Sequence, residues 1–415
     1  MSLFLSLPPL EGVRHLALEQ WNEALRQLGH EVEEAPLRRR HVPPEATAAE
    51  IAAWIARRKP AALFTASALS FTVPEFFHRP EVRAVPAAAF WFDDPYRPVN
   101  RWETRPGFLD ALRLPSVHHF VWDGHWRDWL RERHGVASHP IHLAADPAAF
   151  HPLPAPPESA GEAVFVGTLV SAAHLAAQRA QLPPLLEKVA RQAEAAIAGG
   201  PDGANPFAFL ERIVAALPGR LGEETAALRA RDPDAWLLLE GLTWKWGKNE
   251  VRRRMLRAAV RVAPVAVLSG NLEQTQAGEA EVAALAAGAP HSLRFVDTGA
   301  LDGSRLASLY ARGAVHLQAT DPQSVAGGIP FRVFQTTACA KPLLTDVKPE
   351  LLDCYREKEE IACYRSGEEL ASRLAALLAD TGERDRLAQA GRARFLAQHT
   401  WHHRVAEVFK TLGLS

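Results

Sequence analysis

Short apolar runs alternate with helical patterns along most of the chain, and this alternation restricts the possible folds more than any other feature. In the first 146 residues the apolar runs stand at 3–7, 61–67, 87–94, 118–123 and 139–146. Strands that alternate with helices predict a parallel sheet with helices on both faces. In one intervening helix, 47–58, Thr47 and Glu50 have the spacing of a capping box, which predicts a helix start there.

A second alternating series follows a Pro- and Ala-rich stretch, 147–162, which we interpret as a linker. The apolar runs of this second series stand at 163–168, 265–271, 293–299, 314–320, 342–346 and 361–366. The segment 171–262 between the first two runs is mostly helical in pattern and too long for one crossover. We therefore expect a helical insertion at about 195–245.

The sequence thus predicts two doubly wound α/β domains, 1–150 and 151–393. A chain of 415 residues is too long for a single core, in agreement with this division. Ligands of doubly wound sheets bind outside the carboxyl ends of the strands, and two such domains are expected to form a cleft. Residues that directly follow strands are therefore the candidates for a functional site.

Composition excludes several classes of partner. The formal net charge is −1, which gives no electrostatic footprint for nucleic acid. No apolar run approaches the roughly 20 residues needed to span a bilayer, and the N-terminus lacks the basic start of a signal peptide. The three cysteines have neither metal-ligand spacing nor a disulfide pattern, so we expect a cytoplasmic protein.

The stretch GGIPFRVFQTTACAKPLLTD, residues 327–346, holds the strongest candidate ligand site. Gly327 and Gly328 would let backbone amides approach a ligand, and Pro330 suits the first turn of a helix. The partial positive charge of a helix N-terminus favours an anion there, and a diphosphate is the usual biological anion of that shape. A turn glycine followed by an ordinary packed helix explains the same residues.

Side chains of this predicted helix could complete the anion site. Arg332 lies in the first turn and could make a bidentate contact with a phosphate. Gln335 lies one turn later on the same face and could hydrogen-bond a ribose hydroxyl, with Thr336 beside it.

Basic residues form a second constellation in KWGKNEVRRRML, residues 245–256. Lys248 and Arg252 are four residues apart and so share a helical face, from which one of them could contact the diphosphate. A solvated basic face is the competing explanation. Gly270, at the end of the run 265–271, could permit close approach of a base or phosphate.

Two further strand ends supply candidates. Gly167 and Thr168 follow the first strand of the second domain and could face the phosphates of a ligand, as could Arg179 from the next helix; strand-terminal glycines are also common in any parallel sheet. Asp93 and Asp94 close a strand of the first domain, where a carboxylate could act as a general base.

Competing explanations also exist for the proton acceptor. An aspartate next to Pro95 is readily explained as a turn former. Asp123 and His125 are alternative candidates for the base. His119, inside a predicted strand, is better explained as a packed residue.

From 314 to 409 the chain resembles the C-terminal half of GT-B glycosyltransferases. FRVFQTTACAKPLLTD resembles the Arg-x-Phe-Glu-x-x-Ala-Cys-Gly pattern of the CgeB-like (spore maturation protein-like) branch of the glycosyltransferase group 1 superfamily. The YRSGEEL joint and the HTWHHR tail match this branch too, whereas LGHEV, FWFDDP and FVGT resemble its N-terminal half and the start of its second domain.

The resemblance implies two Rossmann-like domains in a GT-B fold, with a C-terminal helix, 394–415, crossing back to the first domain. It also implies transfer of a sugar from a nucleoside diphosphate sugar to an acceptor, which in such families is a polysaccharide, a protein or a small molecule. The second domain would hold the donor, the first the acceptor. The resemblance implies no cofactor and no bound metal.

The chain departs from the family pattern at three positions. Gln335 stands where the family usually has Glu, Ala340 where it has Gly, and Gly327 where many retaining relatives have a second Glu. The paired-carboxylate signature is therefore missing. Two alternatives follow: a GT-B enzyme of another class, such as a nucleotide-sugar epimerase, or a degenerate fold retained as a binding or scaffold protein.

Overall fold

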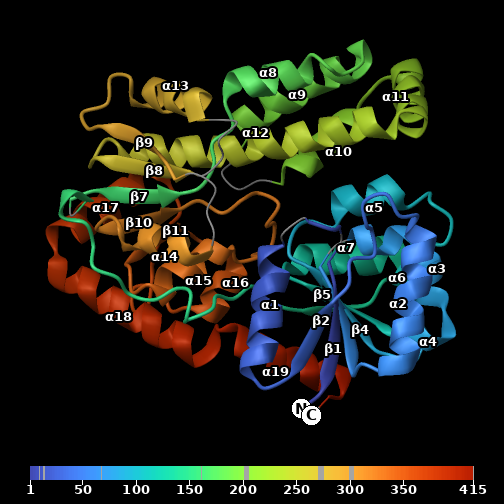
Figure 1. The fold of residues 1–415 in the computed structure, drawn as a ribbon. Helices are drawn as coiled ribbons and strands as arrows, with labels where there is room; N and C mark the ends of the chain where they lie inside the picture. The colour runs from blue at the N-terminus through green and yellow to red at the C-terminus, as the bar shows by residue number, and fades with distance from the viewer. Residues whose placement is uncertain are drawn as a thin grey trace. The chain divides into compact units, whose positions relative to one another are not determined.

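The computed structural model describes residues 1–414 except 9, 13–14, 67, 160, 201–204, 270–274 and 299–302. Its contacts divide the chain into two compact units, one formed by 1–146 with 399–415 and the other by 147–398 (Figure 1).

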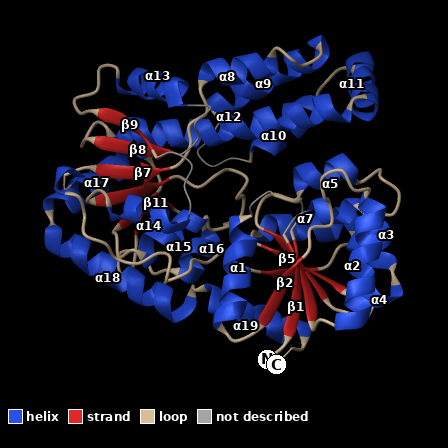
Figure 2. Cartoon of the chain, viewed as in Figure 1, coloured by secondary structure: helices blue, strands red, loops and turns tan. Residues whose placement is uncertain are grey.

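The first unit is built on a parallel six-stranded sheet with the order β2-β1-β3-β4-β5-β6, flanked by helices (Figure 2). Its strands are β1 (Leu3–Leu7), β2 (Glu31–Glu34), β3 (Ala62–Thr65), β4 (Ala87–Trp91), β5 (Val117–Val121) and β6 (Ser138–Pro140). Its helices are α1 (Leu16–Gln27), α2 (Pro44–Arg58), the 3-10 helix η1 (Ala68–Thr72), α3 (Pro74–His78), α4 (Pro80–Arg83), α5 (Tyr96–Trp102), α6 (Phe108–Leu112), α7 (Gly124–His134) and α19 (Trp401–Leu412).

The second unit has its own parallel six-stranded sheet, with the order β12-β11-β10-β7-β8-β9. The strands are β7 (Ala163–Val166), β8 (Val265–Ser269), β9 (Leu293–Asp297), β10 (Val315–Gln318), β11 (Leu343–Asp346) and β12 (Ala362–Tyr364). The helices are η2 (Pro157–Ser159), α8 (Ala172–Arg179), α9 (Pro184–Gly199), α10 (Pro206–Ala215), α11 (Gly219–Arg231), α12 (Pro233–Ala259), α13 (Thr275–Ala286), α14 (Gly303–Ala311), α15 (Phe331–Ala338), α16 (Pro349–Cys354), α17 (Gly367–Ala379) and α18 (Thr381–Gln398).

The strand order of the second sheet fixes where a ligand can bind. The chain runs outward from β7 to β8 and β9, and then returns to place β10 on the other side of β7. Val315 of β10 is in register with Ala163 of β7. The reversal makes the β7/β10 junction the topological switch point, and ligands bind outside the strand ends at that point.

The long helix α12 belongs to two apolar cores at once. Its N-terminal half packs with α9, α10 and α11 through the buried Trp236, Leu239 and Leu242. Its C-terminal half packs on the second sheet through Met255 and Leu256. The long predicted helical segment is therefore a layer of helices held to the sheet by one continuous helix.

The C-terminal helix α19 is anchored in the first unit. The buried Trp401 donates a hydrogen bond from Nε1 to Oε1 of Gln20 on α1, at 2.6 Å. Arg404 donates from Nε to the backbone carbonyl of His142, at 3.0 Å. These contacts explain why the last residues of the chain belong to the unit in which the chain begins.

Two local predictions are wrong. The helix expected to begin at a Thr47 capping box begins a turn earlier at Pro44, and Thr47 lies buried inside it. A proline at the first helical position loses no hydrogen bond, so the start moves there. The strand expected over 139–146 is short: β6 ends at Pro140, and beyond it the N–H of Ile141 still bonds the carbonyl of Val121 on β5 at 3.1 Å.

The end of α15 contains a strained residue that the family pattern anticipates. Ala340 has φ of 51°, in the left-handed region. Its N–H bonds the carbonyl of Thr337 at 3.0 Å, and the N–H of Lys341 bonds that of Thr336 at 3.2 Å. These two bonds form the Schellman motif, whose left-handed position is usually glycine.

We predict that Ala340→Gly stabilises the protein. The left-handed conformation costs a residue with a Cβ roughly 1–2 kcal/mol, and the extra freedom of glycine in the unfolded chain takes back roughly 0.4–1 kcal/mol. The expected gain in the free energy of unfolding is about 0.5–1 kcal/mol, measured by calorimetry of the second unit's transition. Ala375→Gly, on an exposed position of α17, should instead lose about 1 kcal/mol. A loss at position 340 equal to that at 375 would contradict the prediction.

Candidate functional site

Three basic side chains from two helices come together at the switch point of the second sheet. Lys248 and Arg252 lie on α12, and Arg332 lies at the start of α15. The electrostatic environment of Lys248 includes both arginines and a single acidic group, the carboxylate of Asp321. We refer to Lys248, Arg252 and Arg332 as the cation cluster.

Arg252 is held by the loop that follows β7. Its Nη1 donates to the backbone carbonyl of Thr168 at 2.6 Å and to the Thr168 hydroxyl at 3.3 Å. The guanidinium lies 5.6 Å from the centre of the Phe165 ring, and the residue is 2% exposed. Burial and then the charge of Arg332 lower the pKa of Arg252 to about 9, so it stays charged at neutral pH. Its Nε has no hydrogen-bond partner among the described residues, which leaves a donor for a ligand.

Lys248 is buried against an aromatic ring. Its Nζ lies 4.0 Å from the centre of the Trp244 ring, in a cation–π contact. Burial, followed by the charge of Arg252, lowers its pKa to about 7. Because Lys248 and Arg252 are 8% and 2% exposed, the solvated basic face considered for this segment is ruled out for both residues.

Asp321 connects the loop after β10 to α12. One carboxylate oxygen accepts a hydrogen bond from Trp244 Nε1 at 2.7 Å, and the other lies 3.9 Å from Arg252 Nη2. This carboxylate therefore lies near two of the three cations, Arg252 and Lys248. The sequence reasoning missed both Asp321 and Trp244. Asp321 directly follows a predicted strand, and Trp244 lies one helical turn before Lys248. These positions were the sequence signals that indicate both residues.

Arg332 is the least engaged of the three cations. It lies in the first turn of α15 and is half-buried. Among the residues that the structure describes, no hydrogen bond or ion pair holds its guanidinium. It is thus free to contact an anion at the helix N-terminus.

Two of the predicted glycines, Gly167 and Gly327, are required by close packing. A Cβ on Gly167 would lie 2.5 Å from Cζ of Phe165, so the ring that supports Arg252 requires glycine at 167. A Cβ on Gly327 would lie 2.7 Å from the backbone nitrogen of Glu350, so this glycine lets the loop pack on α16. Gly328 is buried beside it. These contacts favour close packing for Gly167 and Gly327, which is compatible with an adjacent ligand.

Gln335 faces an internal partner. The residue is 4% exposed, and its Oε1 accepts a hydrogen bond of 2.5 Å from the hydroxyl of Tyr310 on α14. Thr336 is 2% exposed, and its carbonyl accepts the capping bond from Lys341. The oxygen of Gln335 is thus engaged within the protein, which does not favour the predicted ribose contact. The Tyr310 partner was not found from the sequence.

In the first unit, the two candidate proton acceptors differ sharply. Asp94 is buried and accepts from Arg97 through the backbone N–H at 3.1 Å and through Nη2 at 2.8 Å. This arrangement is the turn-forming role considered for an aspartate beside Pro95. Asp93 is exposed.

The alternative candidates are also engaged in structure. Asp123 caps α7 by accepting from the N–H of His125 at 2.9 Å. His119 is packed between a hydrogen bond from Trp91 Nε1 and one to the carbonyl of Leu112, and burial lowers its pKa to about 4. Arg179 forms an ion pair with Glu194.

Three observations limit the site. Gly270 lies outside the described residues. Within the described ranges, no group of three or more His, Cys, Asp or Glu side chains could hold a metal ion. No helix in the same ranges is both long and apolar enough to cross a membrane.

Comparison with known proteins gives the fold and a partial family match. Residues 252–410 match a family described as glycosyl transferase-like. No curated protein sequence matches the chain. Among solved structures, sucrose-phosphate synthase from Thermosynechococcus elongatus is similar with 14% identity and a TM-score of 0.56, over 99% of this chain and 98% of that one.

Two further structures are similar over the whole chain. A glycosyltransferase from Rickettsia africae has 9% identity and a TM-score of 0.55, over 99% of this chain and 98% of that one. HepE of Anabaena, solved in complex with UDP and glucose, has 10% identity and a TM-score of 0.58, over 99% of this chain and 100% of that one. Two parallel six-stranded sheets with these neighbours confirm the predicted GT-B fold.

The buried ammonium of Lys248 predicts an unusual dependence of stability on pH. Its pKa is about 7 when folded and about 10.4 when unfolded, so the unfolded state binds the extra proton between these values. Stability therefore rises with pH across this window, by at most about 1.4 kcal/mol per unit from this group. Lys248→Met should be more stable than the unaltered protein at pH 7, and the difference should shrink by pH 9.5.

Chemical denaturation at the two pH values measures this difference. Lys188→Met, at an exposed position of α9, serves as the control and should leave the pH dependence unchanged. Equal pH dependence in Lys248→Met and the unaltered protein would show that Lys248 is not held with a lowered pKa.

Proposed function

We propose that the protein is a glycosyltransferase that takes its sugar from a nucleoside diphosphate sugar. The cation cluster at the switch point is the observation that carries this proposal. The three cations repel one another there, Asp321 offsets the charge of Lys248 and Arg252, and the buried Nε of Arg252 has no partner among the described residues. A diphosphate supplies both the missing negative charge and the hydrogen-bond acceptors.

The cluster would act on the leaving group. When the bond from the anomeric carbon to the diphosphate breaks, negative charge grows on the diphosphate oxygens. A cation about 4 Å from such a charge contributes about 4 kcal/mol at an effective dielectric constant near 20. Buried and pre-positioned groups need little reorganisation as this charge develops, which is the condition for strong transition-state stabilisation. We propose that these side chains, without a bound metal, neutralise the leaving diphosphate.

The comparisons support the same function. The glycosyl transferase-like match begins at Arg252 and includes Arg332. One structural neighbour was solved with UDP and glucose, and the same protein with UDP-glucose. By analogy we propose a hexosyl donor of this kind, and within the glycosyltransferases the CgeB-like branch that the stretch 331–346 resembles. We place the reaction in the cytoplasm, because the three cysteines are unpaired and buried.

The acceptor side is assigned to the first unit. The attacking hydroxyl must lose a proton, and an exposed carboxylate can accept it if the configuration inverts. With Asp94 paired to Arg97, Asp93 is the proposed base. The acceptor is a polysaccharide, a protein or a small molecule.

One observation favours a binding protein without transferase activity. The Gln335 oxygen accepts from Tyr310, so α15 offers no carboxylate to the donor. An epimerase-type enzyme is the remaining alternative, and it would convert the donor without an acceptor. Incubation of the protein with a nucleotide sugar that it binds, with and without acceptor mixtures, distinguishes the three functions. A transferase transfers the sugar to an acceptor, an epimerase-type enzyme converts the donor alone, and a binding protein leaves the donor unchanged.

Nucleotide binding should raise the thermal stability of the protein. In a screen of UDP, GDP, TDP and their sugars, a ligand at 100 times its Kd adds about 2.7 kcal/mol to the free energy of unfolding. Arg332→Ala should weaken that binding by at least about tenfold, because a hydrogen bond to a charged group contributes roughly 1.5–3 kcal/mol.

Arg356→Ala is the matched control, since the Arg356 side chain is 66% exposed and pairs with the nearby Glu359 and Glu360. It should bind the nucleotide as the unaltered protein does. No shift with any nucleotide would refute the transferase proposal. Binding that is equal in Arg332→Ala and the unaltered protein would refute the site assignment but leave the function open.

A further inference from the structure

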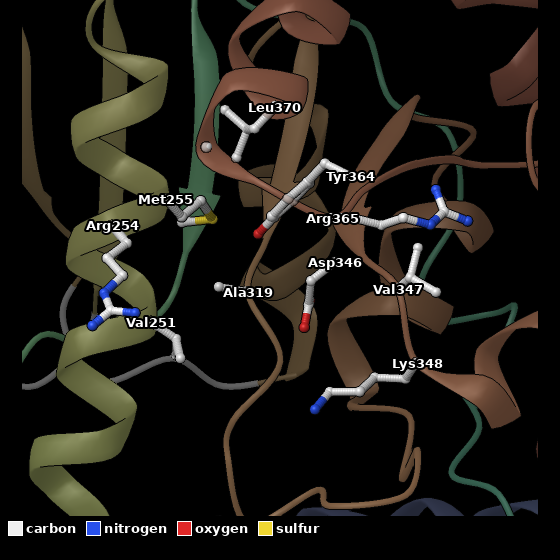
Figure 3. Close-up of a pocket in the computed structure, with 11 residues that line it drawn as sticks. Val251, Arg254, Met255, Ala319, Asp346, Val347, Lys348, Tyr364, Arg365 and Leu370 are labelled. Atoms are coloured by element: carbon white, nitrogen blue, oxygen red, sulfur yellow. The ribbon is translucent and has the colours of Figure 1, made fainter. Parts of the chain in front are cut away.

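A cavity of about 270 Å³ lies between α12 and α17, over the ends of three strands of the second sheet (Figure 3). Val251 and Met255 of α12 form one wall, and Leu370 of α17 closes the top in the view shown. Ala319 follows β10, and Tyr364 ends β12. No residue of the cation cluster lines this cavity.

Asp346, the last residue of β11, directs its carboxylate into this space (Figure 3). The backbone N–H and the hydroxyl of Thr320 both donate to its Oδ1, each at 2.8 Å. The weaker bond from Thr345, at 3.4 Å, also goes to Oδ1. The second oxygen, Oδ2, is therefore the one available to a ligand. Burial raises the pKa of Asp346, opposed by the charge of Lys348.

Lys348 supplies a donor on the same side. It is 9% exposed, and its Nζ makes one hydrogen bond of 3.2 Å, to the carbonyl of Ser324. An ammonium has three donors, so further donors remain for a ligand. Asp346 and Lys348 thus form a built pair of opposite charge at the floor of the cavity.

The remaining charges around the cavity are already neutralised. Arg254 bonds Glu250 at 2.8 Å, and Arg365 bonds Glu357 at 2.7 Å. Both guanidinium groups point away from the space in Figure 3. The groups that face a ligand therefore carry one negative and one positive charge, and the apolar walls come from Val251, Met255 and the Tyr364 ring.

We propose that this cavity binds a single uncharged sugar ring, independently of any nucleotide. A carboxylate accepts from sugar hydroxyls, an ammonium donates to their oxygens, and the C–H faces of the ring pack on the apolar wall. A cavity of about 150 Å³ holds benzene, so about 270 Å³ accommodates a substituted six-membered ring. The balanced charge disfavours phosphates and other ions.

The proposed sugar site lies next to the cation cluster without sharing its residues. Thr320 bonds Asp346, and the following residue, Asp321, faces Arg252. Binding of a free sugar here goes beyond the proposed transfer from a nucleotide donor, and it does not require that donor. A negative result for nucleotide binding would therefore leave the sugar site standing, and the reverse also holds.

Saturation-transfer NMR on the full chain without nucleotide tests the proposal. The probes are glucose, galactose, mannose and N-acetylglucosamine, with cyclohexanol as an apolar ring of similar size. At least one sugar should bind with a Kd in the millimolar range, and cyclohexanol should not. Val251→Phe, which fills the cavity, and Asp346→Asn, which removes its charge, should each weaken binding at least about tenfold.

Two controls separate this site from other effects. Val214→Phe makes the same substitution at a half-buried position of α10, away from the cavity, and should leave sugar binding unchanged. Arg332→Ala should also keep it, whatever happens to nucleotide binding.

The proposal is overturned if no sugar binds, if both cavity variants bind as the unaltered protein does, if cyclohexanol binds equally well, or if Arg332→Ala abolishes sugar binding. Circular dichroism of each variant confirms that it folds. Asp346→Asn keeps an acceptor for Thr320, and so it tests the site even if Val251→Phe does not fold.

Discussion

The burial of Arg252 is the constraint on which the second unit depends. A guanidinium at 2% exposure must find partners in the protein, and Arg252 finds the carbonyl of Thr168, the ring of Phe165 and, more distantly, Asp321. These partners fix α12 against the ends of β7 and β10. Because α12 also carries the core of the neighbouring helices, the same contact sets the position of the whole helical layer. The ring of Phe165 in turn requires glycine at 167.

The cation cluster concentrates electrostatic repulsion at the switch point of the second sheet. Lys248, Arg252 and Arg332 repel one another, and the pKa values of Lys248 and Arg252 are lowered first by burial and then by that repulsion. A structure retained only for stability would gain from apolar residues at such positions. An anion that binds here offsets the repulsion between the cations. The relief of that repulsion then contributes to the free energy of binding.

The sequence was sufficient for the sheets and for part of the site, since strand and helix periodicities depend on local residue order. It put Lys248 and Arg252 on one face of a helix and Arg332 in the first turn of another, and the structure has both arrangements. It could not show that Asp321 meets Trp244 across 77 residues, or that Tyr310 meets Gln335, because such pairs depend on tertiary packing. Local rules also failed where two competed, as at the start of α2, where Pro44 prevailed over the Thr47 capping box.

The amide at 335 has a physical consequence for the cation cluster. Gln335 lies one turn after Arg332 on α15, a spacing at which a carboxylate and a guanidinium pair readily. A glutamate at 335 would thus compete for the arginine that a diphosphate needs, in a site where Tyr310 already satisfies the oxygen. The neutral amide keeps the hydrogen bond to Tyr310 and does not pair with the guanidinium of Arg332. Under the proposed function, the departure from the family pattern therefore preserves the positive charge that would favour a diphosphate.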